Sequence, residues 1–166
     1  MINIKDEITD WLRDAYAMER SQEGALEKLR SNINESVECR TAAAMHLTET
    51  RQHAMIVESL LRSLEQDPSS FKTGLGIMAE KVKELGTSLS HDQEIKELLT
   101  SYAMEHFEIA AYSAIAAAAE KAGLSHIANA CRQIILDEEK MAETIRKELP
   151  RSVLAYLSPT RLARAA

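Results

Sequence analysis

The chain has 166 residues, of which 28% are charged and 4% aromatic, and it carries a formal net charge of −6. This length fits one domain with its own apolar core, and a composition with only five Gly and three Pro favours helices throughout. The acidic balance, without a basic stripe, argues against a nucleic-acid partner, and no apolar run approaches the ~20 residues that span a membrane. Because the N-terminus is charged from its fifth residue and lacks the apolar core of a signal peptide, we expect a cytoplasmic protein.

The first half of the chain predicts a helical hairpin. Apolar residues at helical spacing indicate a first helix over about residues 4–31 and a second over about 35–65, joined by a short asparagine-containing turn. Pro68 and the two serines after it disfavour continuation of the second helix. The connection that follows runs to about residue 92 and contains a shorter predicted helix over about 75–86.

The second half predicts another hairpin of the same kind. A third long helix is expected over about 92–121 and a fourth over about 125–149, separated by Gly123. Pro150 is expected to stop the fourth helix, because proline lacks the backbone N–H that would continue it. The tail, residues 150–166, contains VLAYL, which fits one further helical turn.

The lengths of the connections predict the topology. Tight turns within each hairpin make its helices antiparallel, and the long middle connection makes the second and third helices parallel. This is a ferritin-like, all-α four-helix bundle with one long crossover carrying a short extra helix, and we expect residues 1–166 to form that single domain. An internal repeat supports two equivalent hairpins, since AYAME at 15–19 returns as SYAME at 101–105.

Each long helix carries a glutamate in the middle of its apolar stripe. A lone carboxylate is costly to bury, so four at similar depth indicate that they surround cations. These four residues are Glu19, Glu49, Glu105 and Glu138. His53 lies four residues after Glu49, a spacing that keeps both on one helix face. Bundles with two metal ions use Glu and His in this way, and the mixed donors suit iron or manganese.

Several neighbouring residues remain alternatives. Glu108 lies three residues after Glu105 and is as compatible with a surface acid as with a ligand. The usual Glu-x-x-His spacing would put Gln52 at the ligand position, and a local π-bulge could bring either Gln52 or His53 to the metal. His46 is expected to be a core residue or an outer partner of the site. Two further acids on the fourth helix are weaker candidates, Glu139 and Glu143.

Three segments resemble one bacterial family. HLTETRQH at 46–53, EHFEIAAY at 105–112 and LDEEK at 136–140 are similar to the ferritin-like stress proteins that include YciE and YciF, in an order that fits over about residues 5–150. The resemblance implies a four-helix bundle with a short extra helix, a rubrerythrin-like metal centre and a homodimer. Carried over by position, the implied ligands are Glu19, Glu49, His53, Glu105, Glu108 and Glu138.

The fourth helix departs from the broader di-iron pattern. The positions three and four residues after Glu138 are Met141 and Ala142 instead of a histidine. The second metal position is therefore expected to be oxygen-rich, weak or empty.

Two functions compete at this point. The first is a redox-active protein with two iron ions, or manganese, that reacts with O2 or peroxide during stress. The second is a non-catalytic, metal-stabilised dimer that acts through binding or as a scaffold, and an iron-storage cage is a weaker third. The dimer is expected to bury the short crossover helix or an outer face with Met78 and Val82. No CxxC pair is present, so an electron donor would come from elsewhere, and no catalytic residue is assigned.

Overall fold

The computed structural model describes residues 3–31, 37–65 and 92–158, and every regular element in these residues is a helix. The helices are α1 (Ile4–Ser31), α2 (Val37–Ser63), α4 (Gln93–Lys121) and α5 (Ser125–Tyr156). The predicted all-α class is therefore confirmed. The predicted crossover helix over about 75–86, with Met78 and Val82, lies outside the described residues.

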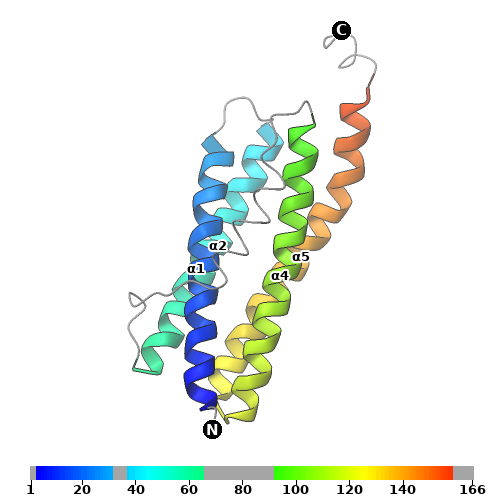
Figure 1. Ribbon diagram of the computed structural model, residues 1–166. Coiled ribbons are helices and arrows are strands. Elements are labelled where there is room, and N and C mark those ends of the chain that lie inside the picture. The colour runs from blue at the N-terminus through cyan, green and yellow to red at the C-terminus, as the bar shows by residue number, and fades with distance from the viewer. Residues whose placement is uncertain (1–2, 32–36, 66–91, 159–166) are drawn as a thin grey trace.

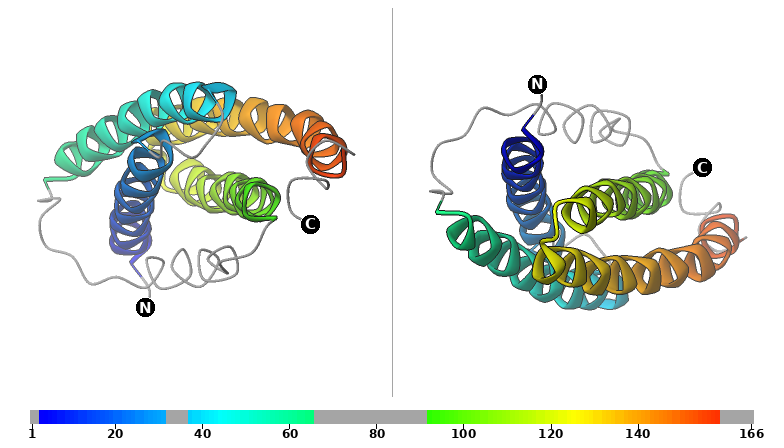
Figure 2. Two further views of the ribbon diagram at one scale, coloured as in Figure 1. Left: turned by 90° about the horizontal axis from the view of Figure 1, so that it is seen from above. Right: turned by 90° about the horizontal axis from the view of Figure 1, so that it is seen from below.

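The four helices form a bundle of two antiparallel hairpins. In Figure 1, α1 and α5 run upward while α2 and α4 run downward, so α2 and α4 are parallel as predicted. Within the hairpins α1 packs on α2 and α4 packs on α5, and the hairpins meet through α1 with α4 and through α2 with α5. Seen along the bundle, α2 and α5 form one side and α1 and α4 the other (Figure 2). This is the ferritin-like topology.

The fourth helix is longer than its sequence indicated. We expected Pro150 to stop it, but α5 continues through Pro150 to Tyr156. The proline ring fixes φ near the helical value and removes one N–H donor. Because Pro150 is exposed, the carbonyl that loses this donor can bond to water. Half-buried Val153 and Tyr156 then continue the packed face of the helix.

The bundle contains two apolar clusters, one toward each end. The larger cluster fills the end near the α4–α5 turn and includes Ile8, Leu12, Val57, Leu61, Tyr112, Ile115, Ile127 and Ile134. A smaller cluster near the α1–α2 turn consists of Leu26, Ala43 and Leu47. The buried polar residues other than Thr9 lie between the two, so both ends of this polar zone are covered by apolar side chains.

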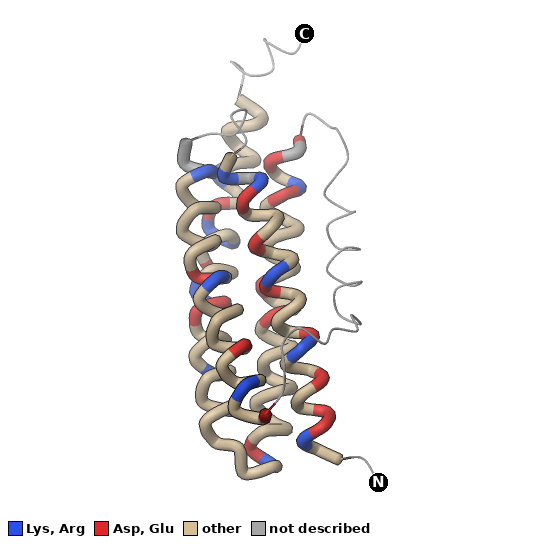
Figure 3. Tube along the Cα trace, turned by 90° about the vertical axis from the view of Figure 1, so that its left-hand side faces the viewer, with Lys and Arg blue, Asp and Glu red and all other residues tan. Residues whose placement is uncertain are grey.

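Charged side chains are interspersed along the outside of the helices. Figure 3 shows Lys and Arg alternating with Asp and Glu along the described helices. None of these helices combines the length and the apolar character that a membrane crossing demands.

Candidate metal centre

A cluster of buried polar side chains lies in the middle of the bundle. All four helices contribute to it, and each member is at most 6% exposed. The members are Glu19 and Gln22 on α1, His46, Thr50 and His53 on α2, Glu105, Glu108 and Tyr112 on α4, and Glu138 on α5. Three of the four glutamates are those of the apolar stripes on α1, α4 and α5.

Helical spacing explains why these residues share one zone. On α2, His46, Thr50 and His53 are separated by four and three residues, so all three face the same side of the helix. On α4, Glu105 and Glu108 are three residues apart, and both are fully buried. Local helix geometry therefore delivers several donors from each hairpin without any irregular backbone.

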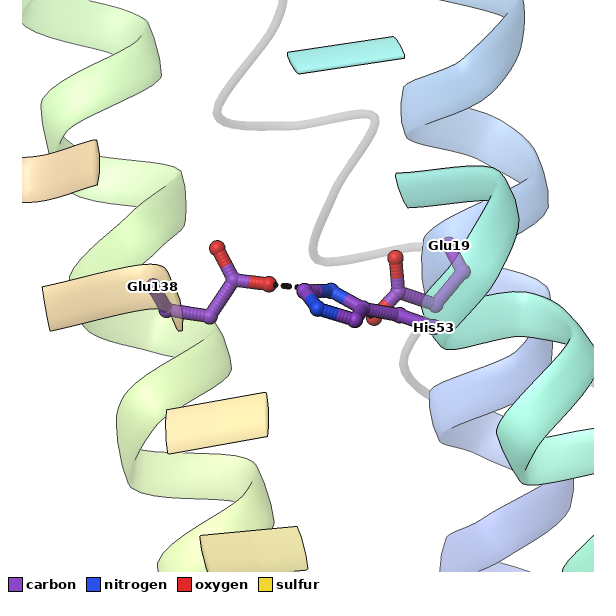
Figure 4. A group of neighbouring side chains, drawn as sticks. All are labelled: Glu19, His53 and Glu138. Carbon is purple, nitrogen blue, oxygen red and sulfur yellow. Dashed lines mark ion pairs between the residues drawn. The ribbon is translucent and has the colours of Figure 1, made fainter. Parts of the chain in front are cut away.

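The first group of potential ligands joins α1, α2 and α5. It consists of Glu19, His53 and Glu138, which offer three ligand atoms within 4.8 Å of one another. Figure 4 shows the His53 ring between the two carboxylates. Its Nδ1 atom is 2.8 Å from Glu138 Oε1 and 3.9 Å from Glu19 Oε1.

The second group joins α2, α4 and α5. It consists of His46, Glu105 and Glu138, again with ligand atoms within 4.8 Å of one another. His46 Nε2 lies 3.5 Å from Glu105 Oε1. Because Glu138 belongs to both groups, they form two adjacent positions with one carboxylate in common. A shared carboxylate of this kind can bridge two cations.

Neighbouring side chains hold parts of this cluster in place. Tyr112 donates its hydroxyl proton to Glu19 Oε1 at 2.6 Å. Gln22 donates from Nε2 to Glu108 Oε2 at 3.1 Å, and the same nitrogen lies 3.5 Å from His46 Nε2. Gln22 and Glu108 occupy equivalent positions in the internal repeat, 86 residues apart. Their contact supports the interpretation of two equivalent hairpins.

Glu49 is the predicted residue that the structure does not bring to the others. It is half-buried and belongs to neither group among the described residues. The fully buried face of α2 passes through Thr50 and Val57, and an α-helix turns by about 100° between neighbouring residues, so Glu49 lies to one side of that face. Glu49 remains a candidate ligand from its sequence position alone.

The structure shows whether the alternative ligand residues are buried or exposed. Gln52 is exposed, whereas His53 is buried in the first group. Glu139 is exposed as well. Glu143 pairs with Arg146 and Lys147 on the outside of α5, which lowers its pKa to about 2. Glu108 is fully buried beside the second group without being a member of it.

His46 is the functional candidate that the sequence pattern underestimated. We expected a core residue or an outer partner, and the structure places it among the ligand atoms of the second group. Its position seven residues before His53 is the signal that pointed there. Seven residues are about two helical turns, so two histidines at this spacing lie on one face of the helix.

Comparison with known proteins identifies the family. Residues 3–158 match the family model described as Domain of unknown function (DUF892). The chain belongs to the DUF892 family. A solved structure of a Xanthomonas campestris pv. campestris protein is 30% identical, with a TM-score of 0.75 over 93% of this chain and 96% of that one.

Two other solved structures share the fold. The Escherichia coli stress protein YciF has a TM-score of 0.78 at 22% identity, covering 92% of this chain and 98% of its own. YcfI from Rhodopseudomonas palustris has a TM-score of 0.75 at 21% identity, covering 87% and 94%. The resemblance to the YciE and YciF family that three sequence segments indicated is confirmed.

Burial dominates the electrostatics of this DUF892 cluster. Burial raises the pKa of Glu19 to about 8; His53 opposes this rise and Glu138 adds to it. Burial also raises the pKa of Glu105 well above its ordinary value, and the neighbouring carboxylates of Glu138 and Glu108 raise it further. In the absence of a cation, Glu19 therefore holds a proton at neutral pH, and burial favours the protonated form of Glu105 as well.

The histidines respond in opposite directions. Burial lowers the pKa of His46. Burial acts in the same direction on His53, but Glu138 and Glu19 overcome it and raise the pKa of His53 to about 9. Burial acts to raise the pKa of Glu138, but the contact with His53 outweighs it and lowers that pKa. The imidazole of His53 therefore favours its protonated form beside Glu138 and Glu19.

The donor set fits divalent cations. Within the described residues, both oxygens of Glu105 and the Oε2 atom of Glu19 are buried without a hydrogen-bond partner. Buried polar atoms normally find a partner, so buried carboxylate oxygens that no donor contacts mark a place for a positive group. Four carboxylates balance two divalent cations in charge, and two neutral imidazoles complete a donor set suited to iron or manganese.

Proposed function

We propose that this DUF892 protein binds two divalent metal ions, in the first place iron, between its four helices. The observation that carries the proposal is the pair of buried groups, Glu19 with His53 and Glu138, and His46 with Glu105 and Glu138, whose ligand atoms lie within 4.8 Å of one another. Glu19, His53 and Glu138 would hold one ion, and His46 and Glu105 would hold the other together with Glu138. Glu108, which is buried one turn along α4 from Glu105, would add a further carboxylate at the second position.

The proposed role is that of a stress-linked dimetal-carboxylate protein with oxidase or peroxidase chemistry. When bound, iron in such a donor set supplies electron transfer to O2 or peroxide. The chain supplies the surroundings. The apolar clusters at both ends of the polar zone exclude water. Glu19 and Glu105 would release their carboxyl protons when a cation binds their oxygens. Two observations support this role: the donor set and the fold shared with a relative named as a stress protein.

Tyr112 is the tyrosine best placed to take part in such chemistry. Its hydroxyl group contacts Glu19 directly at 2.6 Å. Burial raises the pKa of Tyr112 well above its ordinary value, and the contact with Glu19 raises it further. The phenol therefore keeps its proton and remains a hydrogen-bond donor. Tyr16 and Tyr102 are only half-buried.

Iron oxidation tests this proposal. Ferrous iron is added anaerobically to metal-free protein, and oxygen is then admitted while the ferric absorption band is followed. We expect the band to form faster than iron oxidises in buffer, and the Glu105→Ala variant to lose that advantage. A Glu105→Ala variant as fast as the parent would show that the bundle is not where the chemistry happens. Peroxide turnover by iron-loaded, manganese-loaded and chelator-treated protein then distinguishes the metals.

A non-catalytic, metal-stabilised binding or structural protein is the second candidate. The fourth helix favours it, because α5 gives Glu138 to the groups and presents Ala142 where a histidine would extend the donor set. In this case added metal raises the melting temperature, because only the folded state offers the site, and no turnover accompanies it.

We also propose that the protein acts as a homodimer. The support is the family resemblance, which implies a dimer. Light scattering on the purified full chain is the direct measurement. A mass near 37 kDa, twice the 18.5 kDa of one chain, supports the dimer. A monomer at micromolar concentration contradicts it, and a much larger particle supports a storage cage.

A further inference from the structure

The two cation positions differ in how firmly their ligands are held. We propose that the cations bind in order, first at Glu19, His53 and Glu138 and then at His46, Glu105 and Glu138. In this scheme Tyr112 and Asp137 are positioning residues that prepare the first position. The inference rests on the proposed function and adds to it an unequal affinity of the two positions.

Tyr112 fixes the first carboxylate. Its side chain is fully buried in the larger apolar cluster, and its hydroxyl donates to Glu19 Oε1 at 2.6 Å. The other oxygen of Glu19, Oε2, is buried without a hydrogen-bond partner among the described residues. One oxygen is therefore anchored to a rigid phenol, and the other is left for a cation.

Asp137 orients the imidazole of the same position. His53 Nε2 lies 3.4 Å from Asp137 Oδ2, while Nδ1 faces Glu138 and Glu19. A carboxylate that accepts from one ring nitrogen keeps the proton there and directs the lone pair of the other nitrogen toward the metal. Asp137 is adjacent to Glu138 in sequence, so a single turn of α5 gives both the ligand and the positioning group.

At the second position, His46 and Glu105 lack this support. The polar contacts of Glu105 are with His46 Nε2, at 3.5 Å, and with Glu138, and both of these residues are proposed ligands themselves. Gln22 lies 3.5 Å from His46 Nε2, the nitrogen that also faces Glu105, and its amide hydrogens must point away before that nitrogen can bind a cation. The second position therefore needs rearrangement before it binds. A cation at the first position would already hold Glu138, which prepares the shared ligand for the second.

The expected difference in affinity between the two positions can be estimated from the effect of residues that orient metal ligands. Removing a group that orients a metal ligand typically weakens metal binding by about 10–100-fold. We expect the first position to bind about 10-fold or more tightly than the second. Replacing either positioning residue should weaken the first step by a factor in that range.

Manganese alone is a suitable probe. Mn²⁺ is added anaerobically to the metal-free full-length protein, and binding is followed by calorimetry and by electron paramagnetic resonance. For the parent we expect two resolved steps. The first equivalent should give the signal of an isolated ion, and the second should convert it to that of a coupled pair.

Matched variants separate positioning from charge. Asp137→Asn replaces the charged acceptor of His53 Nε2 with a neutral and weaker one, whereas Glu139→Gln removes one negative charge from the exposed neighbour two residues away. We expect Asp137→Asn to weaken the first step by about 10–100-fold and Glu139→Gln to leave it within about two-fold. Tyr112→Phe should weaken the same step, and Tyr102→Phe on the same helix should not.

The outcomes distinguish the two proposals. If the parent binds no Mn²⁺ in the bundle, the proposed function fails and the order fails with it. If it binds two ions with equal affinity, or if Asp137→Asn behaves like Glu139→Gln and Tyr112→Phe like Tyr102→Phe, the order is overturned while the dimetal site stands. A first step that weakens in both positioning variants, with helical content unchanged by circular dichroism, supports the order.

Discussion

Replacing Glu19 by Gln should stabilise the metal-free protein and remove most of the stabilisation that metal confers. The pKa of Glu19 is about 8 in the fold against an ordinary value of 4.5, so the folded state binds this proton more tightly than the unfolded chain does. Its contribution to stability is therefore full below about pH 4.5 and is lost as the pH rises toward 8. At pH 7 the loss amounts to about 3 kcal/mol, at about 1.4 kcal/mol per pH unit.

Glutamine needs no proton and keeps an oxygen that accepts from Tyr112. We therefore expect Glu19→Gln to gain about 2–3 kcal/mol at pH 7 in the presence of chelator, or about 5–10 °C in melting temperature. The assay is thermal unfolding with chelator and with excess Mn²⁺. With Mn²⁺ the parent should be the more stable protein, because the variant lacks a ligand at the first position. A variant less stable than the parent under both conditions would refute the reasoning, and Glu139→Gln is the exposed control.

Three further predictions concern the same cluster. The pKa of His53 is about 9, above its ordinary 6.5, so the stability that its protonated ring contributes is full below pH 6.5 and is lost as the pH rises through 9. The melting temperature of the chelator-treated, metal-free protein should therefore fall across this range. A flat profile would contradict the ion pair. His46→Ala should reduce bound Mn²⁺ from two ions to one while Glu49→Ala leaves two, as measured by metal analysis after dialysis. If Glu49→Ala loses an ion and His46→Ala does not, the ligand set predicted from the sequence, with Glu49 in it, is the better one. Gln22→Glu places another acid beside Glu108, so it should destabilise the chelator-treated, metal-free protein by about 1–3 kcal/mol in urea unfolding. The loss should be much smaller when metal is bound.

Much of the fold followed from patterns within single helices. The bounds of α1 agree with those expected from its apolar spacing, and the parallel course of α2 and α4 followed from the length of the connection between them. The failure at Pro150 has a local cause. A proline stops a helix where its ring or the freed carbonyl has no room, and neither condition holds on the exposed side of α5.

The site was harder to predict on α2 than on the other helices. Its residues between Ala42 and Ile56 are a mixture of small, polar and apolar side chains, so the periodicity fits two neighbouring faces almost equally well. The predicted stripe passed through Glu49, whereas the buried face passes through Thr50. On α1, α4 and α5 bulky aliphatic residues before the glutamates fixed the face, and Glu19, Glu105 and Glu138 are all buried as expected.

The partners that hold the ligands depend on tertiary structure. Tyr112 meets Glu19, and Asp137 meets His53, across separations of 93 and 84 residues. No pattern within one helix reports such a contact. The internal repeat is a partial exception, because Gln22 and Glu108 occupy equivalent positions in its two copies and contact each other across the bundle.

The central claim is that two divalent cations share Glu138 in the middle of the bundle. The most direct measurement is anomalous X-ray diffraction from crystals of full-length protein loaded with Mn²⁺. We predict two anomalous peaks inside the bundle, about 3.5–4 Å apart, as in other two-metal sites, with the Glu138 carboxylate between them. Peaks only at exposed carboxylates, or no peak between the four helices, would contradict this claim.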